Sequence, residues 1–224
     1  QKRAAPLCDW VIEAARAHGR NLMVRLVKGA YWDTEIKAAQ VGGLPDYPVF
    51  TRKVATDVSY LACAKKLLAA SDVIYPAFAT HNANTIGQIK ALAHGKPFEF
   101  QRLHGMGEEL YEELAGVERH LGDERTGVRI YAPVGSHKEL LAYLVRRLLE
   151  NGANSSFVNR IADEQVSVDE LVRDPVAELD ALSPKRKPKI ILPNELFGRR
   201  PKSAGGVLID PPVPAQLLER PTAL

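Results

Sequence analysis

Four strand-like runs, each followed by a helical pattern, constrain the fold of this chain more than any other feature. The runs cover Leu22–Trp32, Val73–Thr80, Phe98–Leu103 and Val128–Val134. Helical patterns occupy Leu7–Ala17, the segment up to Ala70, Asn84–Ala93, Gly107–Leu114 and a stretch from about Ser136. Strands that alternate with helices favour a parallel sheet with crossover helices, in a barrel or in an open sheet. Both architectures bind ligands at the C-terminal ends of their strands.

Polar and aromatic side chains gather at those four strand ends. They are Lys28, Tyr31, Thr80, His81, Asn82, Gln101, His104 and Tyr131. We interpret them as one rim that lines a ligand site. Thr80-His81-Asn82 has no second histidine, cysteine or carboxylate at metal-ligand spacing, so hydrogen bonding to a cofactor is favoured over zinc binding.

The run Leu140–Glu150 (LLAYLVRRLLE) predicts a helix with apolar residues around most of its surface, which should therefore be largely buried. Tyr143, Arg146, Arg147 and Glu150 are spaced so that they can share a face. Two buried guanidinium groups need an anion beside them. That anion is either the carboxylate or phosphate of a ligand, or the acids of an internal ion-pair network that includes Glu150; spacing alone leaves both open.

Arg25 lies within the first strand, where its charge must meet a polar group if the side chain points into a barrel. One interpretation is a salt bridge inside the barrel, and the other is a contact to an electron-rich cofactor atom. The small pair Gly29-Ala30 follows, and it lets a flat ligand approach the backbone closely. Tyr31 and Trp32 then supply aromatic surface suited to stacking.

Composition narrows the class of protein. The 224 residues, 46% of them hydrophobic, carry a net charge of +3, so nothing favours a nucleic-acid partner. Cys8 and Cys63 are far apart in sequence and match no metal or redox spacing, which indicates a reducing cytoplasm. No run is long enough for a transmembrane helix and no secretory signal is present. The chain begins within a helical pattern and not at a methionine, so we expect a piece of a longer protein.

Six strings together resemble the proline dehydrogenase domain of the bacterial bifunctional proline utilization A family. They are VRLVKGAYWD, TRKVATDVSYLACAKKLL, YPAFATHN, FEFQRLHGMGE, RIYAPVGSH and YLVRRLLENGANSSFVNRIAD. The resemblance implies a (β/α)8 TIM-type barrel, with residues 1–162 as its last four βα units. Residues 163–224 would be a linker of short helices and extended, Pro-, Gly- and Lys/Arg-rich chain without helical or strand period. That linker would lead towards an aldehyde-dehydrogenase domain.

The resemblance also implies a function: FAD-dependent oxidation of L-proline to pyrroline-5-carboxylate, with electrons passed to a membrane quinone. The parent would be cytoplasmic, able to associate peripherally with the inner face of the membrane, and would carry a second, NAD-dependent activity. Arg146 and Arg147 would clamp the proline carboxylate, and Arg25 would lie near flavin N5. Tyr131 and Tyr143 would pack around the proline ring, with Leu103 and Tyr31 bordering the pocket. The remaining flavin contacts would come from Val27, Lys28, Gly29, Ala30, Trp32, Thr51, Arg52, Lys53, Thr80, His81, Asn82, Gln101, Glu150 and Phe157.

Two other functions remain open from the residues. One is a half-barrel that binds an anionic sugar or acyl phosphate through Arg146 and Arg147, and the other is a non-catalytic assembly segment. Half a barrel would expose two strand edges and an apolar interior. We therefore expect these 224 residues alone not to oxidise proline.

Overall fold

The computed structural model describes residues 1–29, 31–123, 125–152, 166–183, 190–196, 203–204 and 207–208. Side chains of residues 149–152, 203–204 and 207–208 are not among those described. Three expected site residues therefore fall outside the description: Ala30, Phe157 and the side chain of Glu150.

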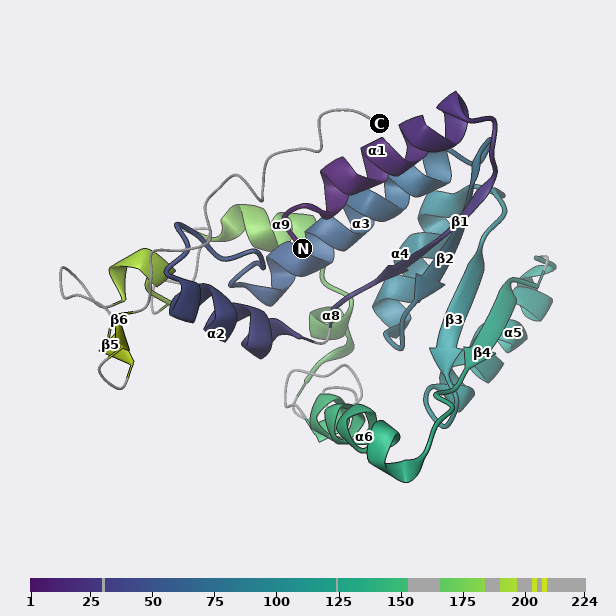
Figure 1. Ribbon diagram of the computed structural model, residues 1–224. Coiled ribbons are helices and arrows are strands. Elements are labelled where there is room, and N and C mark those ends of the chain that lie inside the picture. Colours follow the sequence, from purple (N-terminus) through teal and green to yellow (C-terminus); the bar gives the residue numbers. More distant parts are fainter. Residues whose placement is uncertain are drawn as a thin grey trace.

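A parallel sheet of four strands, in the order β1-β2-β3-β4, organises the chain (Figure 1). Its strands are β1 (Leu22–Val27), β2 (Ile74–Ala79), β3 (Glu99–Leu103) and β4 (Gly127–Tyr131). Helices connect them: α1 (Ala4–Ala17) precedes β1, α2 (Trp32–Gly42) and α3 (Lys53–Ala69) follow it, and α4 (Ala83–Ala93), α5 (Glu108–Leu121) and α6 (His137–Gly152) follow β2, β3 and β4. The expectation of parallel βα units is confirmed.

Two strands end earlier than the sequence pattern predicts. We expected the first to reach Trp32, but β1 ends at Val27 and Trp32 begins α2. We expected the fourth to reach Val134, but β4 ends at Tyr131. Pro133 lacks the amide hydrogen that would continue the ladder, which favours an end before it. α5 is longer than predicted and runs to Leu121, where Gly122 in the left-handed conformation (φ 72°) ends it.

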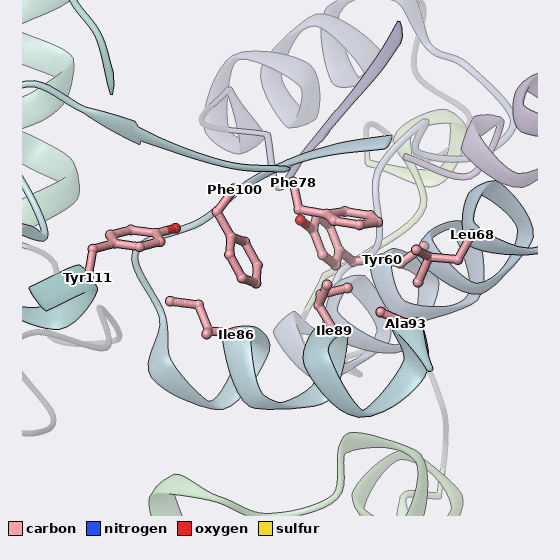
Figure 2. Packing of buried hydrophobic residues seen from close by; sticks show 9 residues of the cluster. Tyr60, Leu68, Phe78, Ile86, Ile89, Ala93, Phe100 and Tyr111 are labelled. Carbon is pink, nitrogen blue, oxygen red and sulfur yellow. The ribbon is translucent and has the colours of Figure 1, made fainter. Parts of the chain in front are cut away.

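The main core lies between the sheet and helices α3, α4 and α5 (Figure 2). Phe78 and Phe100 point from β2 and β3 towards Ile86 and Ile89 on α4, and both phenylalanines are completely buried. Phe98 contacts both rings edge-on, at centroid distances of 5.6 and 5.1 Å. Such edge-to-face pairs stabilise a core beyond the area they bury. This face of the sheet therefore carries the side chains that hold the fold together.

The opposite face of the sheet is open at β1. Met23 and Val27 are 55% and 47% exposed, whereas Val24 and Leu26, which alternate with them, pack against the helices. Side chains alternate between the two faces of a strand, so Arg25 shares the open face with Met23 and Val27. A partial TIM-type barrel presents an open sheet face of this kind on its inner side.

The prediction that the arginine-bearing helix is largely buried is wrong. α6 lies beyond the C-terminal end of the sheet, apart from the helices that cover the core (Figure 1). Leu141 and Leu144 are about half exposed, and Leu148 is 71% exposed. An apolar helix is buried only where another element packs on it, and no such element covers these side chains among the described residues.

Some of the short elements in the C-terminal segment were expected from the sequence and others were not. The two helical pieces expected there are present as α8 (Val168–Leu171) and α9 (Pro175–Ala181). A 3-10 turn, η1 (Pro193–Glu195), and a two-stranded antiparallel sheet, β5 (Ser203–Ala204) with β6 (Val207–Leu208), were not expected. The Tyr47 hydroxyl donates a hydrogen bond of 2.7 Å to the carbonyl of Ile191 and joins this segment to the body.

Candidate functional site

Arg25 is held at the open face of the sheet by two groups from other strands. Its Nε donates a 2.8 Å hydrogen bond to Oε1 of Gln101 on β3. Its guanidinium carbon lies 4.9 Å from the ring centroid of Tyr131, at the end of β4. These contacts fix the direction of the side chain. The sequence allowed a salt bridge or a cofactor contact; the partner of Arg25 among the described residues is an amide and not a carboxylate, so the salt bridge is not found, and the cofactor contact stays a prediction.

A polar chain continues from Gln101 across the sheet. Gln101 Nε2 donates to Oε1 of Glu99 at 2.8 Å. Glu99 in turn accepts from Nε and a terminal nitrogen of Arg129 at 2.7 and 2.8 Å. The pKa of Glu99 lies below its usual range, because Arg129 and Gln101 both donate to the charged form. Sequence analysis missed Glu99 and Arg129; alternation along the two strands was the signal that could have found them, since both share a face with Gln101.

The two adjacent arginines of α6 each face a tyrosine ring. Arg146 lies 4.9 Å from the ring centroid of Tyr31, and Arg147 lies 5.1 Å from that of Tyr143. The Nε of Arg146 is buried and has no hydrogen-bond partner within the described part of the chain. Since α6 lies beyond the C-terminal ends of the strands, the structure brings Arg146 against Tyr31, one of the residues assigned to the rim.

His81, which is half-buried just after the end of β2, accepts a hydrogen bond from the end of β3. Its Nε2 accepts a 3.1 Å hydrogen bond from the backbone amide of Leu103, so Nε2 carries no proton in this arrangement. Burial lowers the pKa of His81, and the nearby charges of Arg147 and Arg102 lower it further. The imidazole is therefore held neutral, and it can present only Nδ1–H to a ligand.

Lys28 has local partners as well. Its ammonium donates to Oδ1 of Asp57 at 2.6 Å and to the Thr85 hydroxyl at 2.9 Å, and it lies 5.2 Å from the Tyr60 ring centroid. Burial lowers its pKa, although Asp57 opposes the shift. The side chain ties the end of β1 to α3 and α4, so the backbone after it, with open space beside Gly29, is what this segment offers to a flat ligand.

Several other expected site residues support the local structure. The Asn82 side chain caps α4 by accepting from the amide of Thr85, and buried Thr80 accepts from the amide of Asn82. The Trp32 indole donates to the carbonyl of Phe50, and Lys53 pairs with Asp57. Thr51 and Arg52 lie directly before α3, with Arg52 at its N-cap position. Leu103 is buried at the end of β3.

A sequence match shows which protein family this chain belongs to. A family profile described as "Proline dehydrogenase" matches residues 1–160. The chain belongs to the proline dehydrogenase family. The resemblance inferred from the six strings is thereby confirmed, as is the (β/α) fold class.

Relatives and solved structures agree with this family. The chain is 57% identical to Bifunctional protein PutA of Escherichia coli K12, over 92% of this chain and 16% of that protein. It is 53% identical to the Rhizobium meliloti protein of the same name, over 97% of this chain and 18% of the relative. The crystal structure of Bradyrhizobium japonicum proline utilization A, mutant D779W, superimposes with a TM-score of 0.82 at 57% identity, covering 89% of this chain and 20% of that one. The chain thus spans about a fifth or less of these proteins.

No helix in the described part of this proline dehydrogenase family member is long and apolar enough to cross a membrane.

Proposed function

We propose that this chain contributes to the oxidation of L-proline to pyrroline-5-carboxylate, as part of a larger protein that degrades proline. The observation that carries the proposal is the placement of Arg146 against Tyr31 with its buried Nε lacking a hydrogen-bond partner among the described residues. A buried N–H donor of a guanidinium costs free energy unless an acceptor meets it. An anion brought by the substrate would supply that acceptor.

The proline carboxylate suits this position. Guanidinium groups bind carboxylates through paired N–H···O bonds, and Arg147 adds a second charge from the next residue of α6. The apolar ring of proline would lie among Tyr131, Tyr143, Leu103 and Tyr31. Holding both ends of a small substrate in one orientation is how such a site would promote the reaction.

The open sheet face fits a flat, electron-rich cofactor. Val27 offers exposed apolar surface, and a side-chain carbon built at Gly29 would meet no atom within 4 Å. Arg25, oriented by Gln101 and Tyr131, presents a positive charge at the same face. FAD bound here would supply the acceptor for the hydride of proline, which carries both electrons of the oxidation. A fixed positive group near its reacting nitrogen would favour the reduced form.

The other flavin contacts proposed from the family resemblance stay proposals: Lys28, Ala30, Trp32, Thr51–Lys53, Thr80–Asn82, Gln101, Glu150 and Phe157. The same holds for the division at residues 162 and 163, for transfer of electrons to a membrane quinone, and for a fused NAD-dependent dehydrogenase. What supports a fused second enzyme is the word "bifunctional" in the names of the relatives.

The test is a proline titration of the full-length protein with Arg146→Met or Arg147→Met. We expect the flavin spectrum to be retained and the half-saturating proline concentration to rise about 10- to 100-fold. Each charge-assisted hydrogen bond is worth about 1.5–3 kcal/mol, and about 1.4 kcal/mol is tenfold. Lys138→Met, an exposed change on the same helix, is the matched control.

Two results would overturn the proposal. If proline does not bleach the flavin of the wild-type protein, the site serves another ligand, such as an anionic sugar or acyl phosphate. If neither arginine variant changes the proline concentration dependence, the guanidinium groups do not bind the substrate.

A further inference from the structure

Cys8 and Cys63, which are 55 residues apart in sequence, lie together in one buried cluster between α1 and α3. Cys8 is 7% exposed and Cys63 is 1% exposed, and each thiol shifts the pKa of the other. They are the two cysteines of the 224-residue sequence. Sequence spacing gave no sign of this pair, since it depends on how α1 packs against α3.

The surroundings favour ionisation of one thiol over the other. Its interaction with the Cys8 thiol lowers the pKa of Cys63; burial opposes this shift, while Lys66 and the Ser59 hydroxyl add to it. The pKa of Cys8 is raised, first by its interaction with the Cys63 thiol, then by burial and by the charge of Cys63. Asp9 is the acid that faces the pair, and it is neutralised by Lys66, whose ammonium lies 2.6 and 2.8 Å from its two carboxylate oxygens.

A small cavity reaches Cys63 from the end of β1. It has a volume of about 60 Å³, and its lining includes Cys63, Ser59, Tyr60, Val27, Lys28 and Gly29. A space of this size admits a molecule slightly larger than water, for which about 10–15 Å³ suffices. Hydrogen peroxide is small enough to enter this cavity, whereas a bulky disulfide is too large.

We infer that Cys63 and Cys8 form a peroxide-reactive thiol pair that closes to a disulfide between α3 and α1. The Cys63 thiolate attacks one oxygen of hydrogen peroxide; the O–O bond breaks, and the departing hydroxide takes a proton to become water. Cys63 is then a sulfenic acid. The Cys8 sulfur attacks the Cys63 sulfur, the S–O bond breaks, and the hydroxyl leaves as water with the Cys8 proton. Two thiols and one peroxide give one disulfide and two waters.

The two cysteines have different roles in this sequence of steps. Cys63 reacts first because it has the greater thiolate character and lines the cavity, and Cys8 resolves the sulfenic acid. A reducing dithiol restores both thiols by exchange. Neither step depends on how the arginines or the flavin act.

The experiment treats the full-length protein with hydrogen peroxide, blocks remaining thiols with an alkylating agent, and analyses tryptic peptides by mass spectrometry. We expect residues 4–16 to be joined to residues 54–65 with the loss of two hydrogens, and dithiothreitol to separate them. In Cys8→Ala, a dimedone adduct should appear on Cys63. In Cys63→Ala, oxidation of Cys8 should be at least about tenfold slower.

Equal oxidation of Cys8 with and without Cys63 would overturn the assigned roles. Recovery of both thiols fully alkylated after peroxide treatment would overturn the pair itself. Circular dichroism of each alanine variant shows whether it has folded, and Cys→Ser versions replace any variant that has not.

Discussion

Arg129 on β4 donates two hydrogen bonds to the carboxylate of Glu99 on β3, one of 2.7 Å from Nε and one of 2.8 Å from a terminal nitrogen. The carboxylate is buried while the guanidinium reaches solvent, and the pair lies at the edge of the sheet, where β4 is the last strand. Glu99 also accepts from Gln101, which accepts from Arg25. Four side chains from three strands thus form one connected polar row, and its far end is the arginine proposed to lie beside the flavin.

Replacing Glu99 with Gln should make the protein less sensitive to acid. The folded state holds the pKa of Glu99 below its ordinary value of about 4.3, so its contribution to stability is present above that pH. That contribution is lost as the pH falls through the lowered pKa. On acidification to below about pH 4.3, the thermal midpoint of the wild type should therefore decrease more than that of Glu99→Gln. Glu112→Gln, an exposed change on α5, is the control, and a parallel fall in all three proteins would refute the expectation.

Gly107→Ala should destabilise the protein more than Gly105→Ala. Both glycines have positive φ, 69° and 77°, so both alanines carry a backbone cost of about 1–2 kcal/mol. Only at Gly107 would the new Cβ meet an atom at 3.0 Å, the Cδ2 of His81, whereas at Gly105 the space is open. Displacing His81 would break its hydrogen bond with the amide of Leu103.

Two measurements check this pair of variants. The thermal midpoint should fall further for Gly107→Ala, and hydrogen exchange at the Leu103 amide should accelerate in that variant alone. An equal decrease of the thermal midpoint in both variants would mean that the contact between the new Cβ and His81 does not affect stability.

The sequence predicted the order and type of the main strands and helices, but not all of their ends. Gly19 follows the end of α1 as expected, whereas α5 continues past the predicted Leu114 to Gly122 and β4 stops at Tyr131, before Pro133. Local signals could not predict the polar row. The Arg25–Gln101 hydrogen bond joins residues 76 apart in sequence, and it forms only because the register of the strands in the sheet brings the two side chains together. The burial of α6 was predicted wrongly for a related reason: its apolar surface says that it can pack, but not what packs on it.

Residue types at the strand ends predicted where the candidate site lies, but not what each side chain does there. Asn82 and Lys28 were expected to contact a cofactor; the structure shows Asn82 in a helix cap and Lys28 in an ion pair, and their contact with a cofactor stays a prediction. Arg146 and Tyr31, in contrast, meet at the predicted edge. Capping and cofactor binding use the same polar residue types, so residue types alone do not separate the two roles.

The imidazole of His81 should titrate below its ordinary pKa of about 6.5, because burial and the charges of Arg147 and Arg102 disfavour its protonated form. Its stabilising effect is therefore present above about pH 6.5 and is lost as the pH falls through the lowered pKa. Removing one charge with Arg147→Met should raise the pKa of His81. Selective 13C labelling of histidine followed by NMR measures this shift, and His81→Gln assigns the signal. An unchanged titration in Arg147→Met would show that Arg147 does not act on His81.

Lys28→Met should destabilise the protein more than Lys53→Met, although both lysines pair with Asp57. Lys28 is mostly buried, and its loss removes the partner on one oxygen of a carboxylate that is only 19% exposed. Lys53 is 58% exposed, so water replaces it readily. An under-satisfied buried polar group costs about 1–3 kcal/mol. The double variant Lys28→Met/Asp57→Leu should then recover part of the loss in urea unfolding, since it leaves no buried charge without its partner. Lys53 also loses Asp57, but it is exposed enough for water to replace the carboxylate. Suppose instead that the double variant loses more unfolding free energy than Lys28→Met and Asp57→Leu lose together when measured singly. The pairing of Lys28 with Asp57 is then not what Lys28→Met disrupts.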